Sequence, residues 1–338
     1  MTLGNRDARV SVLIPVFNRR QLVGDAVRSA LAQNIDGLEI VVVDNCSDDG
    51  TWEVLQEFRD PRLRCVRNEQ NVGLFGNFNR CAAQARGEFS LFLCSDDRLQ
   101  PGFLSVAVPE MEAHPEAVLL SSRADLIDSG GDKIGTAANH FAPGLYVGPS
   151  VPAAWFWVSH HYGVNPLNYP SGILLRTSAL RACLPFRAEF GAPADIDMYL
   201  RVLSRGQLIV TAQTGCQVMC HPGQIGAQTR ALGELARQDL ALLEAYRVDL
   251  EQAGVYKTLQ RQAACRELAA IVRTARTDRR KAGELLRSFD RNVLDVTVGL
   301  GRRTLLAMGR TLLGLRFSPY LRSVGYDHSA RRPNSGAR

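Results

Sequence analysis

Three features that mark common protein classes are missing from this sequence. No run of 18 or more apolar residues occurs, so no segment is long enough to cross a bilayer as a helix. The first apolar run leads into PVFNRR rather than into a G-x-G-x-x-G turn, and no P-loop occurs. These absences argue against a membrane-spanning protein, a nicotinamide-dependent dehydrogenase and a P-loop nucleotidase.

Closely paired cysteines are also scarce. The eight cysteines are scattered, and Cys65 and Cys94 lie within apolar stretches, which favours reduced core thiols over a disulfide framework. Cys216, Cys220 and His221 follow one another closely, but a second close pair of zinc ligands is missing. The amino terminus runs straight into an apolar strand without a secretory leader. We therefore expect a cytoplasmic protein.

Positive charge is concentrated in the carboxyl-terminal part of the chain. Of the 40 Lys and Arg and the 34 Asp and Glu, residues 231–338 hold 20 and 11, and the first 230 residues hold 20 and 23. No aromatic residues alternate with the arginines of the basic part, which argues against a nucleic-acid partner. The two parts therefore face different partners.

Three apolar runs within the first hundred residues end in polar or acidic side chains. They are VSVLIPV (10–16) before Phe17 and Asn18, LEIVVV (38–43) before Asp44, and SLFLC (90–94) before Ser95, Asp96 and Asp97. Their β-branched content predicts strands buried on both faces, and the helical stretches between them predict right-handed βαβ units. Because ligands bind outside the carboxyl ends of such strands, we expect these polar side chains to converge at one edge of the sheet.

Four segments in this order resemble the signatures of family 2 glycosyltransferases. They are VSVLIPVFN, VVVDNCSDDGT, NEQNVGLFGNFNRCAAQARGEFSLFLCSDD and PADIDMYLR, and the resemblance covers about residues 8–225. It implies an α/β fold of the GT-A type, which is a Rossmann-like nucleotide-diphospho-sugar transferase domain. It also implies transfer, with inversion, of a sugar from a nucleotide-diphospho-sugar donor to a saccharide or lipid-linked acceptor. The setting that it implies is bacterial cell-envelope polysaccharide biosynthesis, at the inner face of the plasma membrane.

The resemblance also divides the chain into parts. Residues 1–230 would form the catalytic domain, with a nucleotide-binding half at about 8–122 and an acceptor half at about 123–230. Residues 231–328 would form a basic, mostly helical extension, and the tail 329–338 is expected to be disordered.

The acidic pair after the third run is the predicted metal site. A departing diphosphate builds up negative charge, which Mg²⁺ or Mn²⁺ can neutralise, and these hard cations prefer oxygen ligands. We expect Asp97 to bind the ion and Asp96 to face the ribose or assist the metal; the family often has Asp where this chain has Cys94. By resemblance, His221 would lie near the metal or the phosphates. The structural alternative is that Asp96 and Asp97 form a turn before a helix that begins at Pro101.

The resemblance assigns nucleotide recognition to the ends of the first two runs. Asp44 would accept a hydrogen bond from the base, although a short acid also caps a turn well. Asp48 and Asp49 we assign to that turn. Backbone contacts to the nucleoside would come from Pro15, Val16, Phe17 and Asn18, and the same pocket would be lined by Asn71 and Gly73.

The segment PADIDMYLRVLSRG holds the predicted general base on a helix from about Asp195 to Arg205. Asp195 and Asp197 are two residues apart, so they point about 200° away from each other and at most one faces the substrate. By resemblance, Asp195 is the catalytic base, although Ala194 stands where the family usually has Glu. The alternative makes Asp195 an N-cap and Asp197 a first-turn acid at the helix dipole. Asp197 and Arg201, which could pair with either acid, are placed on the acceptor side.

Two further segments bear on the acceptor and on partners. NYPSGILLR resembles the acceptor-side strand, in which Gly172 would let the backbone approach a sugar closely. Residues 231–277 predict two amphipathic helices separated near Gly254, and residues 302–317 predict a basic amphipathic helix. The latter could lie on an anionic membrane surface, or pack on the catalytic domain or on a second subunit. A catalytically inactive nucleotide-sugar-binding scaffold of a polysaccharide assembly complex is the alternative to an enzyme.

Overall fold

The computed structural model describes residues 8–137, 139–162, 165–221, 224, 235–260 and 262–263. The chain divides into two compact units, residues 1–267 and 268–338, and all described residues belong to the first. The predicted basic helix 302–317 and the tail 329–338 lie outside the described residues. The predicted boundary near residue 230 remains a prediction, since α9 and α10, described below, belong to the same unit as the residues before it.

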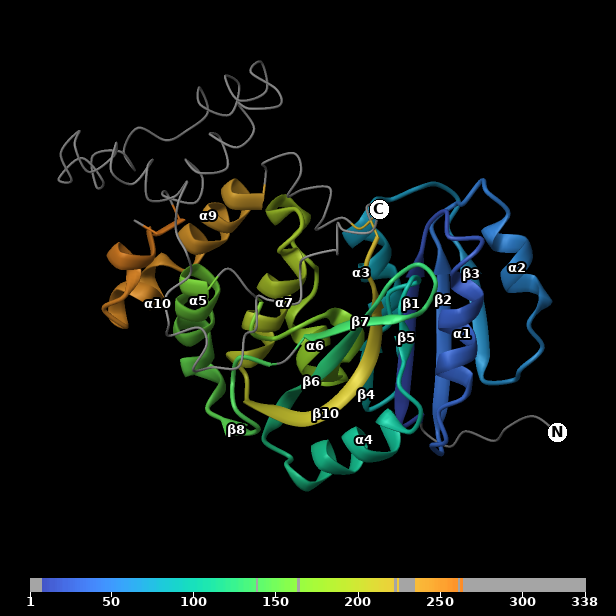
Figure 1. Ribbon diagram of the computed structural model, residues 1–338, viewed down its shortest axis with the longest axis horizontal. Helices are drawn as coiled ribbons and strands as arrows, with labels where there is room; N and C mark the ends of the chain where they lie inside the picture. The colour runs from blue at the N-terminus through green and yellow to red at the C-terminus, as the bar shows by residue number, and fades with distance from the viewer. Residues whose placement is uncertain are drawn as a thin grey trace, which may run out of the picture. The chain divides into compact units, whose positions relative to one another are not determined.

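Four parallel strands form the amino-terminal half of the sheet (Figure 1). They are β1 (Val10–Val16), β2 (Leu38–Asp44), β3 (Leu63–Arg67) and β4 (Phe89–Phe92). The order β3-β2-β1-β4 is the one that successive right-handed βαβ crossovers produce. Buried apolar side chains occupy nearly every position of β1 and β2, so the prediction of strands covered on both faces is confirmed.

The carboxyl-terminal half of the sheet is mixed. Among the described residues, ten strands join one sheet, in which β9 runs antiparallel to β4 and to β6 while β10 runs parallel to β6. The six described strands of this half are β5 (Arg98–Leu99), β6 (Ala117–Ile127), β7 (Lys133–Ala137), β8 (Gly144–Tyr146), β9 (Ile173–Arg176) and β10 (Gln207–Met219). Long β6 and β10 thereby extend the sheet beyond the nucleotide-binding half.

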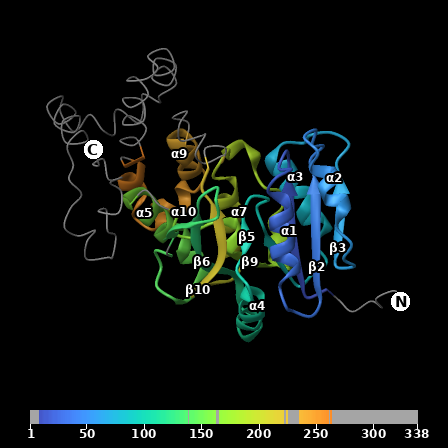
Figure 2. The same ribbon diagram turned by 45° about the vertical axis from the view of Figure 1, so that its right-hand side comes forward.

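Helices cover both faces of this sheet (Figure 1, Figure 2). Among the described residues before 230, the α-helices are α1 (Val23–Leu31), α2 (Thr51–Glu57), α3 (Leu74–Gln84), α4 (Phe103–Ala113), α5 (Val151–Tyr162), α6 (Thr177–Cys183) and α7 (Ala194–Leu203). The 3₁₀ turns are η1 (Gly148–Ser150), η2 (Pro170–Gly172) and η3 (Ala188–Phe190). Side chains alternate along a strand, so Ile40 and Val42 of β2 belong to the core that α1, α2 and α4 cover, whereas Val41 and Val43 belong to the core that α3, α5, α6 and α7 cover.

Helical segments after residue 230 belong to the same unit. Residues 256–260 and 262–263 are helical and contribute Tyr256, Leu259 and Ala263 to its core. The helices α9 (Leu235–Ala245) and α10 (Arg247–Gln252) bury Leu242, Leu243 and Leu250 in the core that α5 and α7 share. Both ribbon views place them beside α5 (Figure 1, Figure 2). The predicted helix end near Gly254 is confirmed, because Gly254 has φ +72° just after α10. The break between α9 and α10 was not predicted.

Several predicted boundaries differ from the observed ones. α4 begins at Phe103 rather than Pro101, because Gly102 has a left-handed φ of +74° and precedes the helix. β10 continues to Met219, past the predicted end at Thr214, through register irregularities between Val210 and Cys216 that break the sequence alternation. Within the described residues, no helix combines the length and the apolar character needed to cross a bilayer.

Candidate nucleotide-sugar site

Loops after β1 and β2 are tied together at the carboxyl edge of the sheet. The Asn18 backbone N–H donates to Ser47 Oγ at 2.9 Å, and Asn18 Nδ2 donates to Asp48 Oδ1 at 2.8 Å. Asn18 has a positive φ of 51°, a conformation that Asn tolerates better than most residues. The segment Pro15–Asn18 therefore lies against the turn that follows Asp44. Within this segment the Phe17 side chain is exposed.

Asp44 ends β2 with its side chain fully buried. Its carboxylate accepts hydrogen bonds from the Ser47 N–H at 3.3 Å and from Ser47 Oγ, and it pairs with Arg67 Nε at 3.1 Å. Hydrogen bonds of this kind are typical of a capped turn, so Asp44 caps the turn after β2, as the structural alternative predicts. Arg67, at the end of the neighbouring strand β3, adds a cation beside the predicted base-binding acid. The role of Asp44 in binding a base remains a prediction.

The other acids of the second motif hold the turn, as assigned. Asp49 accepts hydrogen bonds from the backbone N–H groups of Thr51 at 2.9 Å and Arg20 at 3.0 Å. Burial raises the pKa of Asp49, but the hydrogen bond from the Thr51 hydroxyl and these backbone hydrogen bonds outweigh it and leave the pKa below its usual range. Asp49 is therefore a structural acid.

Asparagines fix the loop that leads into α3. Asn71 Oδ1 accepts hydrogen bonds from Asn45 Nδ2 at 2.7 Å and from the Gly73 N–H at 2.8 Å. Buried Asn77 donates to the Val43 carbonyl at 2.9 Å. Gly73 has φ +77° immediately before α3, a conformation that favours glycine. Asn71 and Gly73 thus shape this loop, and their contact with a nucleotide remains a prediction.

The two acids after β4 occupy different environments. Asp97 is only 3% exposed and accepts hydrogen bonds from Ser171 Oγ at 2.6 Å and from the Met219 N–H at 3.1 Å. Burial, and then the negative charge of Asp96, raise the pKa of Asp97 above its usual range. The Asp96 side chain is 14% exposed, and its Oδ2 lies 2.9 Å from Nε2 of His221. Asp97 therefore anchors this edge of the sheet, whereas Asp96 faces the more open side.

The donor set of this cluster fits a divalent cation. One ligand atom each from Cys94, Asp96 and Asp97 lies within 4.8 Å of the others, and His221 reaches Asp96 from the end of β10. Among the Lys and Arg residues that the structure describes, Arg19 pairs with Asp96, with Nε 4.0 Å from Oδ2. Two adjacent carboxylates with so little compensating charge are the environment in which Mg²⁺ or Mn²⁺ binds.

Asp195 lies in the first turn of α7, and its Oδ1 accepts the Ile196 N–H at 2.7 Å. Burial raises the pKa of Asp195 from 3.8 to about 6, against these backbone hydrogen bonds. Pro193, rather than Asp195, is the N-cap residue, so the capping alternative is wrong. A carboxylate with a pKa near neutrality is suited to accept a proton from an acceptor hydroxyl.

Asp197 points into the core instead. It is fully buried, pairs with Arg187 and with Arg201 Nε at 2.9 Å, and accepts a hydrogen bond from Tyr246 Oη at 3.2 Å. The predicted divergence of Asp195 and Asp197 on α7 is thus realised, and Arg201 pairs with Asp197. No surface of Asp197 is left to contact an acceptor directly, so Asp197 and Arg201 hold the acceptor half together.

Gly172 is also fully buried, at the end of η2. A Cβ atom there would lie 2.7 Å from Ser122 Oγ and 3.3 Å from Cys216 Sγ. The close approach that requires glycine is therefore made by neighbouring strands in the described structure, rather than by a sugar. Its position on the acceptor side remains a prediction.

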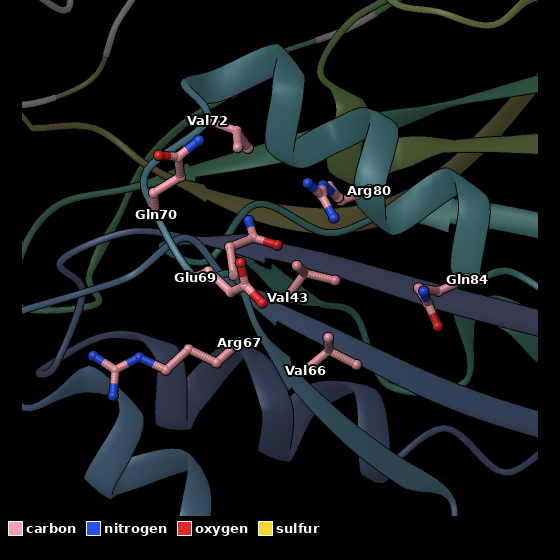
Figure 3. A pocket seen from close by; sticks show the side chains of 9 residues that line it. Val43, Val66, Arg67, Glu69, Gln70, Val72, Arg80 and Gln84 are labelled. Atoms are coloured by element: carbon pink, nitrogen blue, oxygen red, sulfur yellow. The ribbon is translucent and has the colours of Figure 1, made fainter.

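A hollow of about 280 Å³ lies between α3 and the ends of β2 and β3 (Figure 3). It is lined by Val43, Val66, Arg67, Asn68, Glu69, Gln70, Val72, Arg80 and Gln84. Val43 faces α3, whereas Asp44, the next residue, points to the opposite face of the strand. None of Cys94, Asp96, Asp97 and His221 lines this hollow, but Arg67, which pairs with Asp44, does.

Sequence reasoning missed three residues that support the site. The first is Ser171, which links two parts of the site. Its Oγ accepts a hydrogen bond from the Cys94 N–H at 3.0 Å and donates one to Asp97. Arg19 and Arg67 face the carboxylates of Asp96 and Asp44. Arg19 directly follows the first identified segment and Arg67 directly precedes the third, so both could have been found, whereas no sequence signal links Ser171 to an acid 74 residues earlier.

Comparison with known proteins agrees with this geometry. Residues 11–153 match the model of the family described as Glycosyl transferase family 2. Over 88 residues the chain is 34% identical to the Escherichia coli UDP-Glc:alpha-D-GlcNAc-diphosphoundecaprenol beta-1,3-glucosyltransferase WfaP. The aligned segment covers 26% of this chain and 35% of WfaP. The matches span between 20% and 62% of the length of five curated relatives, so they compare only parts of those proteins.

Solved structures share the fold. S. aureus TarS 1–349 in complex with UDP-GlcNAc has a TM-score of 0.60 at 17% identity, over 85% of this chain and 83% of that one. The mannosyltransferase PcManGT from Pyrobaculum calidifontis, in complex with GDP-Man and Mn²⁺, has a TM-score of 0.55 at 18% identity, over 91% and 86%. The predicted GT-A fold is confirmed. The predicted resemblance to glycosyl transferase family 2 is confirmed over residues 11–153.

Proposed function

We propose that this family 2 glycosyltransferase moves a hexosyl or related group from a nucleotide-diphospho-sugar to a saccharide or lipid-linked acceptor, with inversion. The observation that carries the proposal is the contact of Asp96 with His221 beside the buried Asp97, at the carboxyl edge of β4. Ligands collect at this edge in α/β sheets, and the donor set suits a cation that accompanies a diphosphate. TarS and PcManGT, which share the fold, were solved with UDP-GlcNAc and with GDP-Man and Mn²⁺.

Asp96 and His221 are the residues that we assign to Mg²⁺ or Mn²⁺, in place of the first choice, Asp97. Both oxygens of Asp97 already accept hydrogen bonds from Ser171 and Met219, and the side chain is almost fully buried. Asp97 then fixes the strand end and adds negative charge. When bound, the cation neutralises the charge that develops on the departing diphosphate.

The donor nucleoside would lie against Pro15–Asn18, with Asp44 and Arg67 beneath the base and Asn71 and Gly73 along its edge. Arg19 reaches toward the same carboxylate as His221, so it is placed to meet a phosphate oxygen. These contacts account for a nucleotide-sugar donor but leave its base and sugar open.

Asp195 acts as the general base. Its carboxylate takes the proton from the acceptor hydroxyl while that oxygen forms a bond to the anomeric carbon. The bond from that carbon to the diphosphate breaks at the same time, and the electron pair leaves with the diphosphate. A base with a pKa of about 6 is ionised at neutral pH and still accepts a proton effectively.

Cell-envelope polysaccharide assembly is the setting that we propose, in the cytoplasm at the inner face of the membrane. The chain is related to enzymes of such pathways, and WfaP is named for a diphosphoundecaprenol acceptor. Peripheral membrane contact through residues 302–317, or a second subunit bound there, belongs to the same proposal.

The test is release of nucleoside diphosphate from UDP-glucose, UDP-GlcNAc and GDP-mannose, with MnCl₂ or with EDTA. Mn²⁺-dependent release from one donor, lost in Asp195→Asn and increased by an added saccharide or lipid-linked acceptor, is the expected result. Donor binding without release would favour the inactive scaffold instead.

A further inference from the structure

One buried hydroxyl near the proposed base has no partner. Tyr199 is fully buried on α7, and none of the described residues forms a hydrogen bond with its Oη. Buried polar groups are nearly always hydrogen-bonded, because an unmade bond forfeits the hydration that the group had in the unfolded chain. The unpaired hydroxyl of Tyr199 is an exception to this rule, and it lies next to the proposed base Asp195, so we ask which group it binds during the reaction.

The hydroxyl lies close to Asp195. Tyr199 follows Asp195 by four residues on α7, so the two side chains share one face of the helix, and the Tyr199 side chain leans toward the earlier turn. The titratable groups around the hydroxyl are Asp195 on the same helix and Cys94 after β4. Beyond Cys94 come Asp96 and Asp97. Of the two nearest groups, the carboxylate is the strong acceptor, whereas the thiol is a weak one.

A second tyrosine, Tyr246 at the N-cap of α10, gives a direct comparison. Tyr246 is also buried, and its Oη reaches both the carbonyl oxygen and the carboxylate of Asp197 at 3.2 Å. Each acid of α7 thus has a tyrosine beside it. The pair at Asp197 has its hydrogen bond, whereas the pair at Asp195 does not.

We propose that Tyr199 is the positioning residue of Asp195: its hydroxyl donates a hydrogen bond to the Asp195 carboxylate when an acceptor hydroxyl is bound. Hydrogen bonds of a catalytic group are often open in the absence of substrate and close in the reacting complex. One oxygen of Asp195 would then be held by Tyr199, and the other would be aimed at the acceptor proton. The inference rests on the proposed function, because it assigns a partner to the proposed base.

The test compares Tyr199→Phe with the matched control Tyr246→Phe. Rates of nucleoside diphosphate release are measured between pH 5 and pH 9 with MnCl₂ and whichever of the three donors the wild-type chain cleaves, together with Tm. In Tyr199→Phe we expect kcat to fall by about 10- to 100-fold with KM nearly unchanged. The acid limb of the kcat profile should move to higher pH, because the ionised base loses a donor. Its Tm should stay the same or rise.

Tyr246→Phe should instead lower Tm and leave the acid limb in place, because it removes a hydrogen bond that already exists. Wild-type kcat and an unmoved acid limb in Tyr199→Phe would overturn the inference while leaving the proposed function intact. A fall in Tm equal to that of Tyr246→Phe would also overturn it. A wild-type chain that cleaves none of the donors would contradict the proposed function itself, and with it the base that Tyr199 is inferred to position.

Discussion

Two acids on α7, two residues apart, should respond oppositely to the same substitution. Asp195 is partly buried and its pKa is raised to about 6, so its charged form is disfavoured in the folded chain. Asp197 is buried between two guanidinium groups, so its charge is needed there. Replacing each by Asn removes one negative charge at nearly constant shape, and the pair of variants therefore separates the two environments.

The size of each effect follows from the contacts. Folding raises the pKa of Asp195 from 3.8 to about 6, and each tenfold change in proton affinity corresponds to about 1.4 kcal/mol, so ionisation costs up to about 3 kcal/mol of stability. Asp197→Asn leaves Arg187 and Arg201 without their carboxylate. Since these side chains are 36% and 23% exposed, water screens part of the loss, and we expect about 3 kcal/mol, the lower end for a broken buried pair.

The dependence on pH gives the sharper test. Because folding raises the pKa of Asp195, the stabilising contribution of its protonated form is complete below about pH 4 and is lost as the pH rises through about 6. Asp195→Asn should therefore match the wild type in Tm at pH 4 and equal or exceed it at pH 7.5. Asp197→Asn should melt about 6 to 12 °C below the wild type at pH 7.5.

Thermal unfolding followed by circular dichroism at both pH values is the assay. Activity of the same two proteins is measured alongside, because Asp195→Asn should lose turnover by about 10² to 10⁴ while keeping its fold. If Asp195→Asn melted as far below the wild type as Asp197→Asn, the assignment of a base to one acid and a structural ion pair to the other would be wrong.

Three further changes test other parts of the account. Asp96→Asn should raise the Mn²⁺ concentration needed for half-maximal nucleoside diphosphate binding by at least about tenfold in calorimetry, since it removes a proposed ligand; an unchanged requirement would contradict the metal assignment. Asp44→Asn should weaken diphosphate binding without altering the Mn²⁺ requirement and should lower Tm, because Arg67 loses its buried partner. Gly191→Ala should destabilise the chain by about 1 to 3 kcal/mol, since its Cβ would lie 2.3 Å from Gln238 Nε2 at a φ of +65°. Gly254→Ala is the control, because φ is +72° but no heavy atom lies within 4 Å, and an equal loss there would show that the packing of α9 contributes nothing.

The strands that carry the site could be predicted because their signal is local. The strands β1, β2 and β4 are mostly apolar, and the polar residues that mark their ends are Asn18, Asp44 and Asp96; β3, which reads LRCVR, lacks this signal and was not predicted. The opposed directions of Asp195 and Asp197 follow from helix geometry alone. These features need no knowledge of distant residues.

The features that the sequence could not predict depend on distant residues. The hydrogen bonds of Asp97, the predicted metal ligand, come from Ser171 and Met219, which are 74 and 122 residues away. The close packing at Gly172 is set by Ser122, 50 residues earlier, and its predicted position beside a sugar remains a prediction. An acid at a strand end looks the same in sequence whether its oxygens are open or already accept hydrogen bonds.

Calorimetric titration of the chain with UDP, GDP and dTDP, each with and without Mn²⁺, tests the central claim most directly. The account predicts that one diphosphate binds in a Mn²⁺-dependent manner and that this binding is lost in Asp96→Asn. Absence of binding for all three diphosphates in the presence of Mn²⁺ would contradict a nucleotide-sugar site at the carboxyl edge of this sheet.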